Sequence, residues 1–351
     1  MEEKRQTETE FRIIKVIIAI KRTTFFKSIR SHASKNKIID FSKKATKSLS
    51  SGEKSHSCKW GKGVMVISFF VTLAPIRILI VGILTISLQI VLFFLTLGLD
   101  KNKPYPKKRK AMIQKSAKFV SRSILFLVGI TRIKVNGKEN LKKIAECETE
   151  RVIISNHISI LDIPISMTLF GCIFLAKAET KNNNFIGPII QSLQGMFVKR
   201  TKNKKDGWIF TEIERRCKND DYIPLCIYPE GTTSNGKCIV SFKMGAFSSG
   251  YPLHPTILKY KPKFPFKNVN IAYALQSPVM NLLEILSTMF IEVEIDCLDF
   301  YYPNEEEKQN PRLLRDNVRK YMSEKSGYPL VDSSFFDKKE YVEYLKLKKE
   351  N

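Results

Sequence analysis

The feature that most constrains this chain is an apolar run from Val64 to Leu99, in which Arg77 is the only charged residue. A single helix over these residues would be about 54 Å long, whereas the hydrocarbon core of a bilayer is about 30 Å thick. Such a length is also atypical of a buried helix in a soluble domain. The run therefore predicts a membrane segment that is not one straight span.

Pro75 and Arg77 are expected to break this run into a short arm, Val64–Leu73, and a long arm, Ile78–Leu99. Two arrangements are compatible with the pattern. The long arm crosses the membrane alone while the short arm lies at the interface, or both arms form a re-entrant hairpin whose bend is shielded by protein. Basic residues flank the run equally on both sides, as a hairpin with both ends in the cytosol predicts.

The formal net charge of +25 is concentrated near the apolar run. Residues 1–110 have a net charge of +16, whereas residues 111–351 have only +9. Basic flanks beside an apolar segment are typical of contact with anionic lipid headgroups. Neither zinc-finger spacing nor an aromatic RNA-binding signature accompanies the charge, so we expect membrane lipids and no nucleic acid as partners.

Three further segments bear on the membrane question. Residues 11–30 mix Ile and Phe with Lys and Arg, a pattern shared by interfacial helices and ordinary amphipathic helices. Residues 31–62 are rich in Ser and Lys, which predicts a linker. Ser123–Ile130 is too short to span, so we expect it to pack in the domain or lie at the interface.

Seven cysteines are scattered along the chain, at positions 58, 147, 172, 217, 226, 238 and 297. Their number is odd, their spacing is irregular and no C-x-x-C pair occurs, so neither a disulfide framework nor a metal site is expected. This usage favours a reducing, cytosol-facing environment. The acidic start and the charges inside the first apolar stretch are atypical of a secretory signal.

From Thr131 onward, short β-rich runs alternate with helical patterns. The expected strands are 132–135, 151–155, 173–176, 196–199, 222–228, 256–260 and 291–298. The expected helices are 160–170, 184–193, 205–217, 279–290, 305–323 and 334–349. This alternation predicts an α/β fold with a mainly parallel sheet flanked by helices, preceded by an N-terminal membrane helix or re-entrant helical hairpin. In such sheets, binding sites form at the carboxyl ends of strands.

A histidine and an aspartate follow the expected strand at 151–155, in the segment 156–162 (NHISILD). With His157 in the loop and Asp162 on the first turn of the next helix, the carboxylate can hold one ring nitrogen and leave the other as a general base. This is the logic of a Ser-His-Asp triad in which a substrate hydroxyl replaces the serine. Alone, the spacing is not specific, since a loop histidine with a structural partner would look the same.

Three other motifs accompany this pair. Residues 228–236 (YPEGTTSNG) offer backbone N–H groups, hydroxyls and one carboxylate to a polar ligand, although a simple polar turn has the same composition. The strand at 196–199 delivers Lys199 and Arg200 at its end, which suits phosphate binding as well as a solvated strand end. Residues 254–260 (HPTILKY) form a Pro-containing strand that is core on its pattern alone.

In their order and spacing, these four blocks resemble the glycerolipid acyltransferase family, which includes lysophosphatidic acid acyltransferases. That family's blocks run N-H-x4-D, a Phe-Ile/Val-x-Arg strand, F-P-E-G-T and a Pro-containing strand, and all occur here in order. Residues 74–81, 228–247 and 300–322 look similar to the lysophosphatidylcholine acyltransferase branch. The resemblance covers roughly residues 65–325, and Tyr228 departs from it where the family usually has Phe.

The resemblance implies an O-acyltransferase that uses acyl-CoA as co-substrate, with no other cofactor and no metal. His157 would be the catalytic base and Asp162 the residue that orients it. The acceptor's phosphate and glycerol would be bound by Arg200, Glu230, Gly231 and Thr232. The favoured acceptor is a lysophospholipid of the lysophosphatidylcholine type. The alternatives are 1-acylglycerol 3-phosphate or glycerol 3-phosphate as acceptor and, in another class, a non-catalytic basic membrane protein.

These expectations divide the chain into five parts, beginning with a basic, partly amphipathic segment (1–62), a membrane segment (63–100) and a basic linker with an interfacial helix (101–130). The acyltransferase catalytic domain (131–325) and a C-terminal helix and tail (326–351) follow. The final residues, KKEN, are similar to the dilysine retrieval signal that is read in the cytosol. We therefore expect an endoplasmic-reticulum membrane location, with the Golgi as alternative, and a catalytic domain that faces the cytosol.

Overall fold

The computed structural model describes residues 59–146, 152–198, 207–218, 221–264, 271–272, 278–334 and 337–338. All of them belong to the structural unit Ser55–Val342. The expected segment at 11–30, most of the linker at 31–62, most of the expected helix at 334–349 and the dilysine end lie outside the described residues.

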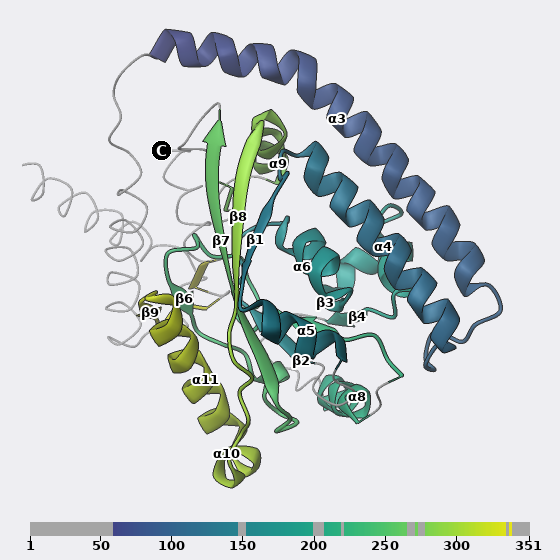
Figure 1. Cartoon of the computed structure of the whole chain (residues 1–351), viewed down its shortest axis with the longest axis vertical. Coiled ribbons are helices and arrows are strands. Elements are labelled where there is room, and N and C mark those ends of the chain that lie inside the picture. The colour runs from purple at the N-terminus through teal and green to yellow at the C-terminus, as the bar shows by residue number, and fades with distance from the viewer. Residues whose placement is uncertain are drawn as a thin grey trace, which may run out of the picture. The chain divides into compact units, whose positions relative to one another are not determined.

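A seven-stranded sheet forms the centre of the described structure, in the order β1-β8-β7-β2-β5-β3-β4 (Figure 1). Its strands are β1 Ile133–Asn136, β2 Val152–Ser155, β3 Ile173–Lys177, β4 Met196–Val198, β5 Leu225–Ile227, β7 Leu253–Phe264 and β8 Phe290–Cys297. Every neighbouring pair is parallel except β7 and β8, which pair antiparallel. The predicted mainly parallel sheet is confirmed.

Helices flank this sheet, as predicted. Figure 1 shows α3, α4 and α6 on one side of the long β7–β8 pair and α11 on the other. The helices are α3 Lys59–Thr96, α4 Lys107–Leu127, α5 Lys138–Glu146, α6 Asp162–Phe170, α7 Gly187–Ser192, α8 Gly207–Cys217, α9 Pro278–Ser287, α10 Glu305–Gln309 and α11 Pro311–Ser326. A separate parallel pair joins β6, Ile239–Val240, to β9, Leu330–Val331.

The central strand β2 is apolar because both of its faces are covered. Val152 and Ile154 belong to one buried hydrophobic cluster and Ile153 to another, as expected when successive side chains point to opposite faces of a sheet. A continuous apolar run is typical of a parallel strand that is buried on both sides. Polar residues begin only where β2 ends, and these residues form the candidate site.

The expected helix at 305–323 is instead two helices, because Pro311 begins the second one. Proline has no backbone N–H, so it fits the first turn of a helix and not its interior. The Asn310 side chain accepts hydrogen bonds from the backbone N–H groups of Arg312 and Leu313 and so caps α11. Asn304 and Glu307 form a capping box at the start of α10.

The predicted break at Pro75 is wrong, because α3 continues through Pro75 as a single helix. A proline removes one backbone hydrogen bond, and a long helix accommodates that loss by bending while it propagates on both sides. The hairpin is therefore not what the chain forms. Among the described residues, Leu73–Thr96 is long and apolar enough to cross a membrane, by length and composition.

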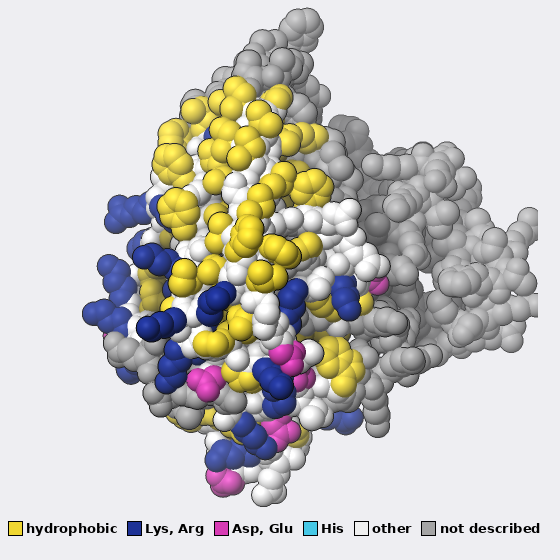
Figure 2. All heavy atoms as spheres, turned by 90° about the vertical axis from the view of Figure 1, so that its right-hand side faces the viewer, with side chains coloured by type: hydrophobic (Ala, Val, Ile, Leu, Met, Phe, Trp, Pro, Cys, Tyr) yellow, Lys and Arg dark blue, Asp and Glu magenta, His cyan; other side chains and the backbone are white. Residues whose placement is uncertain are grey.

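The helix α3 lies along the globular part and contacts α4, α7 and α9. Among the α3 side chains that the structure describes, from Leu73 onward, the buried ones are Ala74, Leu88, Leu92 and Thr96. The guanidinium of Arg77 donates to the carbonyl oxygens of Leu286 and Thr288, at 2.5 and 2.8 Å. The charged group of the apolar run therefore bonds to the end of α9. Figure 2 shows hydrophobic side chains over much of the face formed by α3 and α4, with Lys and Arg beside them.

Candidate active site

The motifs that follow β2 and β5 meet at one edge of the sheet. The two strands are parallel, with Val152 opposite Leu225 and Ile154 opposite Ile227. The loop that holds His157 and the turn that begins at Tyr228 therefore leave the sheet side by side. The Ser234 amide ties them together by donating to the carbonyl oxygen of His157 at 2.7 Å.

His157 and Asp162 are in direct contact, with 2.7 Å between Nδ1 and Oδ2. The Asp162 side chain is fully buried, whereas the His157 side chain is 17% exposed. An ionised carboxylate only accepts hydrogen bonds, so Nδ1 carries the proton in this pair and Nε2 is the nitrogen left for a substrate. Asp162 also begins α6, where the helix dipole favours a negative charge.

Three further donors fix the Asp162 carboxylate. The backbone N–H groups of Ile158 and Ser159 donate to Oδ2 at 2.6 and 3.0 Å. The Tyr260 hydroxyl donates to Oδ1 at 2.6 Å. Burial, followed by the charge of Asp162, raises the pKa of Tyr260 well above its ordinary value, so this phenol stays protonated and donates. These bonds hold the carboxylate in one orientation, and its hydrogen bond to Nδ1 in turn orients the ring of His157.

The role of Tyr260 is not predicted by the sequence, because its apolar strand has the pattern of a core strand. The signal was indirect: β7 pairs with β2 in parallel and continues beyond the end of β2, so a polar side chain on this continuation can reach the loop that follows β2. Asn156, which precedes the histidine, has a structural role. Its side-chain amide donates to the carbonyl oxygen of Leu258 and accepts from the N–H of the same residue, at 3.1 and 2.7 Å, and this fixes the end of β2 to β7.

Tyr228 forms the wall against which the His157 ring lies. The two rings are stacked, with centroids 4.4 Å apart and an interplanar angle of 17°. The Tyr228 ring also stacks with Phe174, and its hydroxyl lies 3.1 Å from the Ser166 hydroxyl oxygen. Burial raises the pKa of Tyr228 well above its ordinary value. A tyrosine fits here in place of phenylalanine because its hydroxyl has a hydrogen-bond partner.

The turn after β5 places Glu230, Gly231 and Thr232 beside this pair. Gly231 has a φ of +62°, a left-handed conformation that glycine adopts without strain. An added Cβ at Gly231 would come within 2.6 Å of the Lys243 side chain, so that chain lies directly against the turn. Glu230 and Thr232 are buried, and Gly231 is half-buried.

Glu230 is fully enclosed by the surrounding protein. Neither of its carboxyl oxygens makes a hydrogen bond of normal geometry to the described residues. Burial raises its pKa well above the ordinary range and the Asp162 charge raises it further, while nearby Ser234, the His157 backbone and Arg319 oppose the shift. The uncharged acid is therefore the favoured form, and Glu230 does not add a second negative charge beside Asp162.

The described residues thus bring together five of the six residues predicted for the site. Arg200 lies outside the described residues, two positions after the end of β4. Within the described part of the chain, no group of three His, Cys, Asp or Glu side chains is arranged to hold a metal ion.

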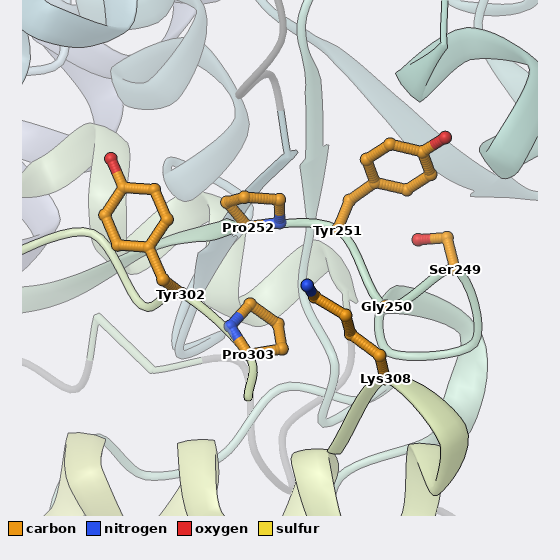
Figure 3. A pocket seen from close by; sticks show the side chains of 7 residues that line it. All are labelled: Ser249, Gly250, Tyr251, Pro252, Tyr302, Pro303 and Lys308. Carbon is orange, nitrogen blue, oxygen red and sulfur yellow. The ribbon is translucent and has the colours of Figure 1, made fainter. Parts of the chain in front are cut away.

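A cavity of about 460 Å³ lies at the opposite end of β7, where that strand begins (Figure 3). Its lining includes Tyr251 and Tyr302, and Figure 3 shows Pro252 and Pro303 between them. Lys308 also lines the cavity, and its ammonium group pairs with Glu305 at 2.7 Å. Because Leu253 pairs with Val152 at the start of β2, this cavity is separated from His157 by the length of that strand.

The sequence is similar to those of known proteins. Residues 132–259 match the family model described as Acyltransferase. Lysophosphatidylcholine acyltransferase 1 of Homo sapiens is 32% identical over 274 residues, which are 76% of this chain and 49% of that protein. Lysophospholipid acyltransferase LPEAT1 of Arabidopsis thaliana is 30% identical over 258 residues, which are 66% of this chain and 64% of that protein.

Among solved structures, the 1-acyl-sn-glycerophosphate (LPA) acyltransferase PlsC of Thermotoga maritima matches 71% of this chain and 98% of its own, with 16% identity and a TM-score of 0.45. The chain spans about half the length of the curated lysophosphatidylcholine acyltransferases that it matches. The His157–Asp162 pair and the Glu230–Thr232 turn both fall within the matched residues 132–259. The chain belongs to the acyltransferase family.

Proposed function

We propose that this protein is an acyl-CoA-dependent O-acyltransferase that re-acylates a lysophospholipid, with a lysophosphatidylcholine-type acceptor favoured. The observation that carries the proposal is the 2.7 Å contact between His157 Nδ1 and the buried Asp162 carboxylate at the end of β2. The relatives at 30–32% identity are a lysophosphatidylcholine acyltransferase and a lysophospholipid acyltransferase, which supports a lysophospholipid acceptor.

In the proposed mechanism, His157 acts directly on the acceptor. Its Nε2 takes the proton of the acceptor hydroxyl while the hydroxyl oxygen attacks the carbonyl carbon of the thioester. A C–O bond forms and the C–S bond breaks, and the imidazolium returns its proton to the CoA thiolate. The stacked Tyr228 ring and the fixed Asp162 carboxylate hold the imidazole in place, and the negative carboxylate stabilises the imidazolium.

The acceptor's phosphate and glycerol are assigned to Arg200 and the Glu230–Thr232 turn. A charged Glu230 would repel a phosphate, whereas burial favours its neutral form, which removes this repulsion. Because Glu230 is fully enclosed, we assign it to the support of the turn and assign the contacts with the acceptor to the half-buried Gly231 backbone and to Arg200.

The lipid acceptor is proposed to reach this site from a membrane. Large apolar side chains on α3 and α4 point outward, among them Leu79, Phe94, Phe119 and Phe126, each 62–69% exposed. Figure 2 shows hydrophobic side chains gathered on one face with Lys and Arg alongside, an arrangement that suits acyl chains and anionic headgroups. We further propose an endoplasmic-reticulum membrane as the location, with the site facing the cytosol in agreement with the cysteine pattern.

The test is the release of CoA thiol by purified membranes that hold the full chain, with one acyl-CoA and a panel of acceptors. The panel holds lysophosphatidylcholine, lysophosphatidylethanolamine, lysophosphatidate and glycerol 3-phosphate. We expect the fastest release with a lysophospholipid, and fastest release with lysophosphatidate or glycerol 3-phosphate would favour the alternative acceptors. Release independent of acceptor would contradict acyl transfer, and no release would favour the non-catalytic alternative.

The role of His157 is tested by His157→Ala, with His32→Ala as a matched control outside the matched domain. We expect His157→Ala to abolish transfer at unchanged expression, because no other group takes the hydroxyl proton in this mechanism. His32→Ala should retain wild-type activity. Full activity of His157→Ala would end the assignment of His157 as the base.

A further inference from the structure

Residues 329–333 and Lys338 are bonded to the loop that carries the Glu230–Thr232 turn. The strand β9 pairs with β6, with Leu330 opposite Ile239 and Val331 opposite Val240. The amide of Ile239 donates to the carbonyl oxygen of Pro329 and the amide of Ser241 to that of Ser333, both at 3.0 Å. The loop is therefore bound at its far end by a segment about ninety residues later in the chain.

Lys338 binds the near end of the same loop. Its ammonium group donates to the carbonyl oxygen and the hydroxyl of Thr233, at 2.8 and 3.0 Å. The next residue, Ser234, donates its amide to the carbonyl oxygen of His157 at 2.7 Å. Thr233 and Ser234, which directly follow the turn, thus link Lys338 to the backbone of His157, the proposed base.

Arg319 on α11 connects the strands β6 and β9. Its guanidinium donates to the carbonyl oxygens of Val240 and Val331, at 3.0 and 2.8 Å, and so bridges β6 and β9. Its positive charge also acts on Glu230, whose pKa it lowers against the larger effect of burial. The segment is thereby fixed to the α11 side of the fold.

We propose that residues 328–334 together with Lys338 are a strap that positions the acceptor-binding turn, and that Lys338 is its positioning residue. This inference rests on the proposed function, since it assigns the turn to the acceptor. Two hydrogen bonds from a charged donor are stronger than neutral ones, so Lys338 contributes strongly to holding Thr233 in place. The ammonium charge at Thr233 also attracts the phosphate that every proposed acceptor carries.

The strap predicts a specific kinetic pattern. The change is Lys338→Met, with Lys338→Arg as the conservative variant and Lys320→Met as the matched control. Lys320 is an exposed lysine on α11 whose contact with Glu324 is 3.8 Å long. In Lys338→Met, we expect the KM for the lysophospholipid to rise about tenfold, the loss typical of a charge-assisted hydrogen bond. The KM for acyl-CoA should stay unchanged, and Lys338→Arg should restore most of the acceptor affinity.

Hydrogen exchange of the full chain, without substrate, provides the second measurement. Amides of residues 232–236 should exchange about tenfold faster in Lys338→Met than in wild type, Lys338→Arg and Lys320→Met, because the turn opens more often. Unchanged exchange would overturn the strap whether or not transfer occurs. Equal losses in both KM values, in kcat and in thermal stability would reduce Lys338 to a general structural residue and also overturn the proposal. Absence of transfer in wild type would instead reject the proposed function, with the exchange result still deciding the strap.

Discussion

Replacing Asp162 by Asn removes the negative charge behind His157 and changes little else. The carboxylate is fully buried and accepts from His157 and two backbone N–H groups at Oδ2, and from Tyr260 at Oδ1. An asparagine oxygen can take the place of Oδ2, and its NH₂ group can donate to the Tyr260 hydroxyl, which then acts as acceptor. Asp162→Asn therefore keeps the geometry and tests the charge.

The expected size of the effect follows from these contacts. A hydrogen bond to a charged group contributes about 1.5–3 kcal/mol, and the carboxylate's bond to the ring becomes an ion pair when His157 takes the proton. Losing this stabilisation in the transition state corresponds to a fall of roughly 10- to 200-fold in kcat, at about 1.4 kcal/mol for each factor of ten. The KM values should change little, because the turn at Glu230–Thr232 is not altered.

The assay is a double-mutant cycle of Asp162→Asn and His157→Ala, read as CoA release with a lysophospholipid acceptor at enzyme concentrations high enough to detect the trace activity left without His157. If Asp162 acts through His157, the substitution has no further effect once His157 is absent. The thermal unfolding temperature of Asp162→Asn should stay within a few degrees of wild type, since the backbone contacts are retained. An equal loss of residual activity in both backgrounds would refute the role of Asp162 as the orienter of His157.

Two further predictions concern stability. Burial lowers the pKa of His254 to about 4, from an ordinary value of 6.5. The unfolded chain therefore binds a proton at His254 more readily than the folded chain does. The stability that is present above pH 6.5 should be lost as the pH falls toward 4. The loss of unfolding free energy is at most about 3 kcal/mol. Thermal melts of a His254→Phe variant between pH 7 and pH 4 should show a shallower decline of stability than wild type. Parallel declines in the two proteins would contradict this role of His254. Arg77→Met should destabilise the docking of α3 on α9 by about 2 kcal/mol, because two carbonyl bonds from a charged donor are lost. Hydrogen exchange of α9 should increase, and unchanged protection would show that apolar contacts alone hold the helix.

The sequence determined the features whose cause is local. Alternating apolar runs predicted the parallel sheet because β2 and β5 bury every residue, and a buried strand has a recognisable composition. The contact between His157 and Asp162 follows from a spacing of five residues across a strand end and a first helical turn. Their proximity to the Glu230–Thr232 turn follows from parallel strands, whose carboxyl ends share one edge of the sheet.

Only the tertiary structure decided the features that depend on distant partners. Tyr260 reads as core and becomes a ligand of Asp162 because β7 lies beside β2. The strands β6 and β9 are two residues long, too short for any periodic pattern, and each exists because the other pairs with it. Pro75 reads as a break, yet α3 continues through it because packing along α4 and α9 stabilises the helix beyond its local propensity. Local patterns fix what a segment prefers, and contacts between segments far apart in sequence fix where its polar groups find partners.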